Sequence, residues 1–337
     1  MAKATQTSAK VQKNDEFYTQ LTDVSKELMH YKQHFKDKIV LCNCDDPTWS
    51  AFWKYFHLNF SALGLKKLIS THYDKNEPTY KMEYTGGDDN NIEAGAITPL
   101  EGNGDFRNQE CINLLDEADI VVTNPPFSLF REYVAVLMEH EKKFIIWGNN
   151  NAISYKDIFS LIKDSKIWAG YLFNKTCIFR VGDGYKFDEK ITSEMNDGFH
   201  YSKVPAISTF TNLDIQKRHE KLILWKEYSE TDYPSYYNYD AINVDKVDLI
   251  PCDYDGAMGV PITFLNKYNS EQFDIIGLGI ATSGLDIGVQ PYAPHHKKYR
   301  KEVQHKGQVD GDLYMVDEHD HPVVPYARIL IRKKVGA

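Results

Sequence analysis

The sequence has 337 residues, of which 42% are hydrophobic and 26% charged, a composition that excludes a largely disordered chain. No apolar run reaches the ~20 residues that cross a bilayer, and Met1–Asn14 lacks the apolar segment of a secretory signal, so we expect a cytoplasmic protein without a membrane partner. The net charge of −9, from 39 basic and 48 acidic residues, by itself disfavours a nucleic-acid partner, although the distribution of charge decides this question.

Helices and strands alternate along the first half of the chain. Short apolar runs predict strands buried on both faces, and apolar residues at helical spacing predict the helices between them. This alternation is typical of an α/β fold with a doubly wound, mostly parallel sheet, which binds ligands at the carboxyl ends of its strands. In chain order we predict helix Thr22–Phe35, strand Lys38–Asn43, helix Trp49–Leu63, strand Leu65–Thr71, a weaker strand Ala96–Leu100, helix Gln109–Glu117, strand Asp119–Thr123, helix Ser128–His140, strand Phe144–Trp147 and helix Tyr155–Lys163.

Longer loops distinguish the rest of the chain from this regular alternation. The polar stretch Asp74–Gly95 is expected to be a surface insertion. Lys166–Phe173 and Thr176–Val181 predict the two strands of a hairpin, before a loop rich in Gly, Asp and Lys at Gly182–Gly198 and a strand at Ala206–Thr211. The second half therefore resembles an accessory region rather than a continuation of the sheet.

The five cysteines are scattered and odd in number, and none forms a Cys-x-x-Cys pair. Neither a disulfide framework nor a zinc ribbon is indicated, and we predict no metal site.

Asn124-Pro125-Pro126-Phe127 stands directly between a predicted strand and a predicted helix. An exocyclic amino group on a planar base is a poor nucleophile, because its lone pair is delocalised into the ring. The side-chain oxygen of Asn124 and the carbonyl of Pro125 can accept its two hydrogens and direct the lone pair at an electrophilic methyl group, and proline fixes φ without a competing N–H. Phe127 offers a flat apolar surface for the base. The alternative is a proline-stiffened turn without chemistry.

The methyl donor must lie beside this loop, and three other segments can contact it. Within Gly104–Phe106, after the third predicted strand, a carboxylate can accept from an adenine amino group while the aromatic ring packs on the base; the alternative is a surface turn. Asp45 and Asp46, after the first strand, can bind an ammonium group or ribose hydroxyls. Phe17–Thr19 precedes the first helix, where both core packing and ligand contact remain open.

His295–Lys306 contains five Lys or Arg residues, three His and one Glu in twelve positions. Both a solvated surface segment and a phosphate-contacting segment fit this composition. The candidate DNA contacts are Lys297, Lys298, Arg300 and Lys301.

The order of these motifs resembles that of the EcoRI-type adenine-specific DNA modification methyltransferases, which use S-adenosylmethionine. The similarity runs from about residue 14 to 277, with a last match near the C-terminus, and Ser283–Gly311 lies outside it. The similar stretches are Asn14–Gln20 (NDEFYTQ), Leu41–Pro47 (LCNCDDP), Leu63–Ile69 (LGLKKLI), Gly104–Arg107 (GDFR), Asp119–Phe130 (DIVVTNPPFSLF), Tyr239–Val244 (YDAINV), Met258–Leu265 (MGVPITFL) and Tyr326–Lys334 (YARILIRKK).

The resemblance implies a Rossmann-like methyltransferase fold and an enzyme, monomeric or weakly dimeric, that flips adenine out of double-stranded DNA as a restriction-modification, orphan or phage modification enzyme. It implies a basic tail at 1–14, a catalytic domain at 15–225, a target-recognition region at 226–325 and a returning strand and tail at 326–337. By position, the cofactor contacts are Tyr18, Thr19, Asp45, Asp46, Asp105 and Phe106, and the base contacts are Asn124, Pro125 and Phe127.

One departure from the wider superfamily concerns the loop after the first strand. Asp46-Pro47-Thr48-Trp49-Ser50 stands where a glycine-rich loop is usual, which leaves the contacts to the methionine end of the cofactor open. Two further readings also stay open: methylation of an RNA base or a protein glutamine, and a catalytically silent DNA-binding relic.

Overall fold

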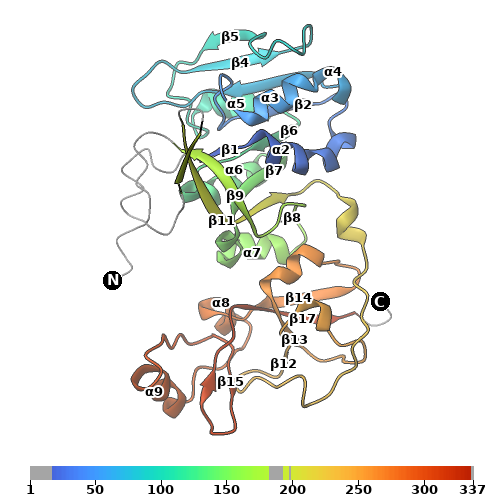
Figure 1. The fold of residues 1–337 in the computed structure, drawn as a ribbon, viewed down its shortest axis with the longest axis vertical. Helices are drawn as coiled ribbons and strands as arrows, with labels where there is room; N and C mark the ends of the chain where they lie inside the picture. The colour runs from blue at the N-terminus through green and yellow to red at the C-terminus, as the bar shows by residue number, and fades with distance from the viewer. Residues whose placement is uncertain (1–16, 182–192, 197–198, 335–337) are drawn as a thin grey trace. The chain divides into compact units, whose positions relative to one another are not determined.

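The computed structural model describes residues 17–181, 193–196 and 199–334, so the predicted tail at 1–14 lies outside the described residues. The chain divides into two units (Figure 1). Unit 1 consists of residues 1–153 and 167–215, and unit 2 of residues 154–166 and 216–337. Among the described residues, no helix combines the length and apolarity required to span a membrane.

Four parallel strands form the centre of the large sheet of unit 1. β2 (Ile39–Cys42) lies between β3 (Lys67–Thr71) and β6 (Ile120–Thr123), and β7 (Lys143–Asn149) follows β6. Almost every residue of these strands is buried, which explains why their sequences are nearly continuous apolar runs. The strands predicted at these four places are confirmed.

Helices cover both faces of this parallel centre (Figure 1). On one face, side chains of the first helices join Val40 and Cys42 in the main apolar cluster. Gly64 ends α4 (Phe60–Leu63) in the left-handed conformation, with a φ of 65°, as the sequence predicts. The helical elements of unit 1 are α2 (Leu21–Leu28), η1 (Met29–His34), α3 (Ala51–Leu58), α4 (Phe60–Leu63), α5 (Gln109–Glu117), η2 (Phe127–Leu129), α6 (Phe130–Glu139) and η3 (Asn150–Ser154).

Antiparallel strands extend the sheet beyond β3, which corrects two predictions. β4 (Tyr80–Tyr84) pairs with β3 inside the segment predicted to be a surface insertion. The predicted third strand exists as β5 (Ala96–Pro99), but it pairs antiparallel with β4 at the sheet edge and all its residues are exposed. Met82 and Tyr84 are buried while their neighbours are more open, so β4 is a short alternating strand within polar sequence.

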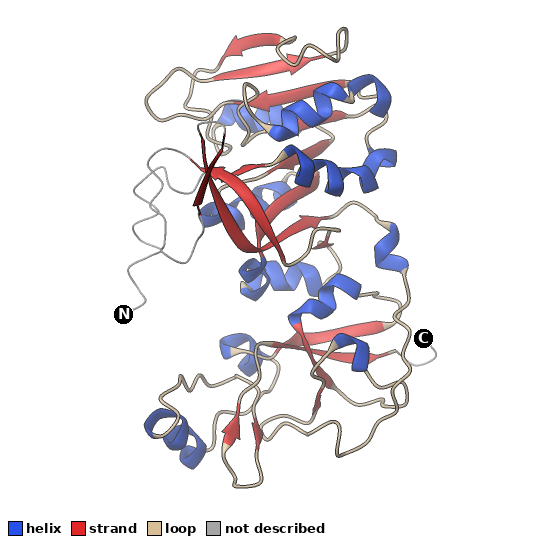
Figure 2. Cartoon of the chain, viewed as in Figure 1, coloured by secondary structure: helices blue, strands red, loops and turns tan. Residues whose placement is uncertain are grey.

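Antiparallel strands also extend the sheet beyond β7, so the α/β class is confirmed but the sheet is mixed outside its parallel centre (Figure 2). The two strands predicted as a hairpin do not pair with each other; both pair with the long strand β11. The predicted loop at Gly182–Gly198 includes the strand β10, and the remainder of that loop lies outside the described residues. The strands on this side are β1 (Phe17–Thr19), β8 (Trp168–Ala169), β9 (Lys175–Val181), β10 (Ser193–Asn196) and β11 (Phe199–Thr211).

The register of β11 brings these strands to the carboxyl edge of the parallel centre. Thr211 lies opposite Ile145, and Ile207 lies opposite Asn149 at the end of β7. Residues 199–206 therefore continue past that end, and β9 and then β1 pair along this extension. A bulge between Val204 and Ile207 interrupts the register at the bend.

Unit 2 contains a smaller, four-stranded sheet in the order β12-β13-β17-β14 and a two-stranded hairpin, β15-β16. The helix predicted at Tyr155–Lys163 is confirmed as α7 and belongs to this unit. The elements are α7 (Lys156–Lys163), η4 (Gln216–His219), β12 (Ile242–Asn243), η5 (Val247–Leu249), β13 (Met258–Pro261), η6 (Ile262–Lys267), β14 (Phe273–Leu278), α8 (Ala281–Asp286), α9 (Pro294–Glu302), β15 (Met315–Val316), β16 (Pro322–Val323) and β17 (Arg328–Lys333).

Candidate active site

The carboxyl ends of β2 and β6 form the switch point of the parallel sheet. From β2 the chain proceeds to β3 on one side, whereas β6 and then β7 lie on the other side. α/β sheets bind ligands in the crevice at such a point. The two loops that leave this point carry Asp45 and Asp46 after β2 and Asn124 to Phe127 after β6.

Asp45 connects these two loops. Its carboxylate accepts hydrogen bonds from the hydroxyl of Ser50 at 3.1 Å, from the hydroxyl of Thr123 and from the backbone N–H of Asn124. Asp45 is only 5% exposed, and burial raises the pKa of its carboxyl group to about 7. With its oxygens occupied by three protein donors, Asp45 holds the Asn124 loop against the end of β2.

The raised pKa of Asp45 predicts a specific pH dependence of stability. A carboxyl group that ionises near pH 4 in the unfolded chain and near pH 7 in the fold binds its proton more tightly when folded. Its contribution to the free energy of unfolding is therefore complete below about pH 4 and is lost as the pH rises through 7. Between pH 5 and pH 8, urea unfolding of the wild type should lose about 3 kcal/mol relative to Asp45→Asn.

The exposed carboxyl group of Glu139 on α6 provides a control for this measurement. Glu139→Gln should keep the wild-type pH dependence. If Asp45→Asn also keeps it, the buried carboxyl group is not the source of the slope.

Asp46 connects the loop after β2 to the side of the sheet formed by β3 and β4. One carboxylate oxygen accepts from the hydroxyls of Thr48 at 2.7 Å and Tyr80 at 2.9 Å, and the other pairs with Nδ1 of His72 at 2.9 Å. Burial, followed by the hydrogen bond to Asp46, raises the pKa of Tyr80 to about 12, so this phenol remains a donor at neutral pH. The sequence does not predict Tyr80 and His72 as site residues, because Tyr80 lies in the polar segment that predicts a surface insertion and His72 stands just before it.

Asn124 follows β6 directly, at the place predicted for the reacting base. The residue is partly exposed, while its Oδ1 atom is shielded from solvent, and Pro125 is buried. Phe127 is partly exposed and packs edge-on against Phe179 of β9, with ring centroids 6.4 Å apart. The asparagine, proline and aromatic ring of the motif thus lie between the end of β6 and the strands that extend beyond β7.

The Gly104–Phe106 segment reaches the same edge of the sheet although the strand before it lies elsewhere. Gly104 has a φ of 74°, and a Cβ atom there would come within 2.2 Å of the carbonyl oxygen of His72, so only glycine fits this approach to the end of β3. The Asp105 carboxylate pairs with Arg107 at 2.7 Å, which lowers the pKa of Asp105. Phe106 is buried and packs edge-on against Tyr133 at 5.0 Å.

Tyr18 and Thr19 are also placed at this edge, through the pairing of β1 with β9. The Tyr18 ring packs edge-on against Trp49, in the loop after β2, with centroids 4.0 Å apart. Thr19 is 8% exposed, and its hydroxyl has no hydrogen-bond partner among the described residues. Because buried hydroxyls are normally hydrogen-bonded, Thr19 offers an available polar group at the site.

Ser202 is a second residue of this kind, and no sequence motif points to it. It is buried in β11 and its hydroxyl likewise lacks a partner in the described part of the chain. Thr19 and Ser202 lie directly opposite Phe179 on its two sides, so the three side chains share one face of the sheet. Two buried hydroxyls therefore flank the ring against which Phe127 packs.

The four predicted DNA contacts lie on α9 in unit 2, and they differ in exposure. Lys297 pairs with Asp310 at 2.7 Å. Arg300 is buried and donates to the carbonyl oxygen of Gly307 and to Gln304, so its guanidinium group is used within the fold. Lys298 and Lys301 are exposed. Lys298 lies 4.0 Å from the carboxylate of Glu302, one turn further along the helix. Phosphate contact from this helix stays a prediction, and the two exposed lysines are the residues that test it.

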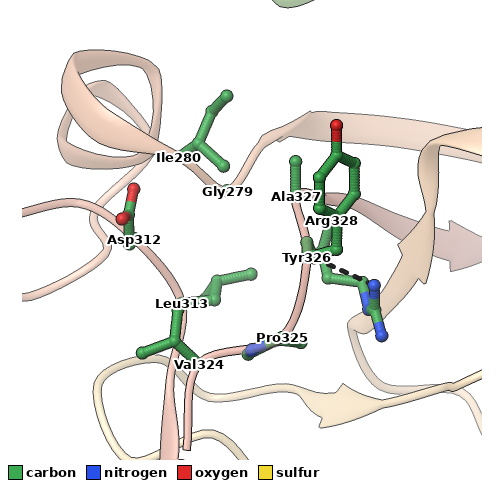
Figure 3. Close-up of a pocket in the computed structure, with 9 residues that line it drawn as sticks. All are labelled: Gly279, Ile280, Asp312, Leu313, Val324, Pro325, Tyr326, Ala327 and Arg328. Atoms are coloured by element: carbon green, nitrogen blue, oxygen red, sulfur yellow. Dashed lines mark hydrogen bonds between the residues drawn. The ribbon is translucent and has the colours of Figure 1, made fainter. Parts of the chain in front are cut away.

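A hollow of about 150 Å³ is found in unit 2, beside the loop before β17 (Figure 3). None of the residues predicted to contact a cofactor or base lines it, so it is distinct from the candidate site. Its lining residues are Gly279, Ile280, Asp312, Leu313, Val324, Pro325, Tyr326, Ala327 and Arg328.

Comparison with known proteins gives one family and several relatives. The sequence model of the family described as adenine-specific methyltransferase EcoRI matches residues 5–334. Type II methyltransferase M.EcoRI of Escherichia coli is 43% identical over 304 residues, which cover 86% of this chain and 93% of that protein. Type II methyltransferase M.MpnI of Mycoplasma pneumoniae is 43% identical over 272 residues, covering 80% of this chain and 83% of that protein. No solved structure matches the chain significantly.

Proposed function

The chain belongs to the family of the EcoRI adenine-specific methyltransferase, and from this premise we propose that it transfers a methyl group from S-adenosylmethionine to N6 of an adenine flipped out of double-stranded DNA. The observation that carries the proposal is the position of Asn124 at the switch point, where Asp45 fixes the backbone of its loop. The membership identifies an adenine-specific methyltransferase, and this disfavours the glutamine-directed and silent readings.

In the proposed mechanism, the chain binds and orients the amino group rather than deprotonating it beforehand. Oδ1 of Asn124 and the carbonyl oxygen of Pro125 accept the two N6 hydrogens, so the nitrogen lone pair points away from the ring plane. Phe127 stacks on the base. Oδ1 is shielded from solvent, so the atoms that shield it must move before the amino group can reach it. When the new bond forms between the nitrogen and the methyl carbon, the bond from that carbon to the donor sulfur would break, and the nitrogen would then lose one proton to water.

The residues present at the switch point fit S-adenosylmethionine, which supplies the electrophilic methyl group when bound. The available hydroxyl of Thr19, the ring of Tyr18 and the carboxylates of Asp46 and Asp105 provide polar and apolar contacts around one edge of the sheet. Phe106 supports this edge from the core. Asp45 is predicted as a further contact, but it is buried, unlike the partly exposed Asp46 and Asp105, and its hydrogen bonds favour positioning the Asn124 loop instead.

We propose that the cofactor binds at this edge although the loop after β2 is not rich in glycine. Ser50 accepts from the backbone N–H groups of Phe52 and Trp53 and so caps α3, while Trp49 packs on Tyr18. Side-chain contacts of Ser50 and Trp49 therefore hold the loop between β2 and α3 in place, and β1 lines the proposed cofactor site beside it.

Double-stranded DNA is the proposed partner, and α9 supplies a testable part of the contact. Replacing Lys298 and Lys301 together by alanine should weaken duplex binding and reduce the slope of log affinity against log salt by up to about 1.8, or about 0.9 for each lost phosphate contact. Alanine at Lys32 and Lys36, two exposed lysines of unit 1, makes the same charge change as a control. An unchanged slope in the α9 variant would assign that helix to ordinary surface.

The function itself is tested by expressing the protein in a bacterial host that lacks adenine methylation. Mapping N6-methyladenine across the host DNA should show one short sequence motif methylated in cells with the wild type and unmethylated in cells with Asn124→Ala. Host DNA without N6-methyladenine in either strain, at equal levels of folded protein, would contradict the proposal. Methylation confined to host RNA would instead favour the RNA-base reading.

The Type II names of the relatives suggest the setting of this activity. We propose a DNA modification enzyme of a restriction-modification system, or an orphan or phage enzyme of the same kind, that works in the cytoplasm as a monomer or weak dimer.

A further inference from the structure

Two consecutive histidines at the start of α9 face an aspartate in the turn between β15 and β16. Nε2 of His295 lies 3.2 Å from Oδ2 of Asp320, and Nε2 of His296 lies 3.1 Å from Oδ1 of the same carboxylate. The ligand atoms of the three residues lie within 4.8 Å of one another. No sequence motif announces this cluster, because the aspartate follows the histidines by more than twenty residues and belongs to another element.

His296 is held in one orientation. Its side chain is 1% exposed, and its Nδ1 atom lies 3.2 Å from the hydroxyl of Tyr314. Nε2 faces two oxygen acceptors, the Oδ1 atom and the carbonyl oxygen of Asp320, both at 3.1 Å. Either a hydrogen atom or a metal ion must therefore lie between Nε2 and these oxygens. A histidine whose Nδ1–H is held by a second group presents Nε2 to a metal.

The aspartate is held in place as well. One carboxylate oxygen of Asp317 accepts the backbone N–H groups of His319 at 2.9 Å and His321 at 2.8 Å, which closes the turn on both sides of Asp320. Asp320 itself adopts the left-handed conformation, with a φ of 59°, and this directs its side chain toward α9. The ring of His296 and the turn that carries Asp320 are thus in place before any ion binds, whereas the side chains of His295 and Asp320 are 59% and 63% exposed.

The distances suit a transition metal. With bonds of about 2.0–2.1 Å in a tetrahedral zinc site, neighbouring ligand atoms lie about 3.3 Å apart. Each histidine Nε2 lies at nearly this separation from one of the two carboxylate oxygens, and one ligand atom from each residue falls within 4.8 Å of the others. Two imidazole nitrogens and one carboxylate are ligands for Zn²⁺ and its neighbours, whereas Mg²⁺ and Ca²⁺ require six or more oxygens. We propose that His295, His296 and Asp320 bind one Zn²⁺-class ion, with water in the fourth position.

The proposed ion has a structural consequence. It would join the first turn of α9 to the β15–β16 turn, in addition to the contact between Tyr299 of α9 and His321, whose rings stack 4.2 Å apart. Binding requires that Nε2 of His296 carries no proton, because the nitrogen uses the same lone pair for a proton and for a metal ion. The ion therefore acts as a clip that fixes the helix carrying Lys298 and Lys301.

The test is a titration of the full-length, tag-free, metal-stripped protein with ZnCl₂ in competition with a chromogenic chelator. The wild type should bind one equivalent of Zn²⁺, and Asp320→Asn should lose at least about 100-fold in affinity, more than the loss typical for an outer-shell residue. Asparagine tolerates the left-handed backbone at this position. His305→Asn is the matched control, because His305 is exposed, lies just beyond α9 and also has a positive φ of 51°.

A second measurement locates the ion and does not depend on a folded variant. Anomalous diffraction at the zinc edge from wild-type crystals should place a peak between His295, His296 and Asp320. A wild type that binds no zinc, an affinity unchanged in a folded Asp320→Asn, or a peak at other residues only would each overturn the proposal. MgCl₂ in place of ZnCl₂ should leave the chelator competition unaffected.

Discussion

Alanine in place of Asn124 is expected to slow methyl transfer by about 100- to 1,000-fold, the loss typical when one preorganised hydrogen-bonding group of a transition state is removed. The bond from N6 to Oδ1 strengthens as the nitrogen becomes pyramidal, so its loss affects the reaction step more than binding. The affinity for S-adenosylmethionine should stay within about threefold, because the cofactor contacts remain. Single-turnover rates on a duplex with one target site, together with cofactor titrations, separate the two effects.

Asn113 provides a matched control for this variant. It is exposed on α5, and its replacement by alanine removes the same group from the same unit. Asn113→Ala should react at the wild-type rate. Wild-type turnover by Asn124→Ala would contradict the assigned role, because methyl transfer would then not need the side-chain oxygen of Asn124.

Alanine in place of Phe127 should weaken capture of the extruded base by about 10- to 100-fold, because stacking of a base on an aromatic ring contributes about 1–3 kcal/mol. Binding of the duplex as a whole should change less, because most of its affinity comes from phosphate contacts. A fluorescent adenine analogue at the target position reports extrusion, as its emission rises when it leaves the stack.

Two further variants distinguish stacking from simple packing against Phe179. Phe127→Tyr keeps the flat ring and should keep the fluorescence change, whereas Phe127→Leu keeps much of the apolar volume and should lose most of it. Equal signals from all four proteins would exclude stacking on this residue. A loss only in Phe127→Ala, with Phe127→Leu normal, would identify packing rather than stacking as its contribution.

The parallel centre of the fold was predictable, because strands buried on both faces are written as uninterrupted apolar runs. The runs at β2, β3, β6 and β7 carry this signal, and Gly64 marks a helix end through its positive φ. In β4, buried and more open residues alternate over only five positions within polar sequence, so the sequence does not predict this strand or the edge of the sheet beyond β3. The pairing of β9 with β11 instead of β8 depends on tertiary contacts that local sequence does not encode.

The site was predictable to the same extent as the strands that hold it. Since the carboxyl ends of parallel strands meet at one edge, the loops bearing Asp45 and Asn124 could be expected to approach each other. That Asp45 is buried and bonded to Ser50 and Thr123 could not, because burial is a property of the assembled loops. The same reason applies to the buried hydroxyl of Ser202, which has no hydrogen-bond partner among the residues that the structure describes.

The proposed mechanism depends on where the amino group is held, and a structure of the complex tests this most directly. The complex would contain the wild type, a duplex with the methylated motif and an unreactive analogue of S-adenosylmethionine. We expect an extruded adenine with N6 within hydrogen-bonding distance, about 3 Å, of both Oδ1 of Asn124 and the carbonyl oxygen of Pro125, and with Phe127 against its ring. An extruded adenine bound elsewhere, or one whose N6 meets neither oxygen, would contradict it.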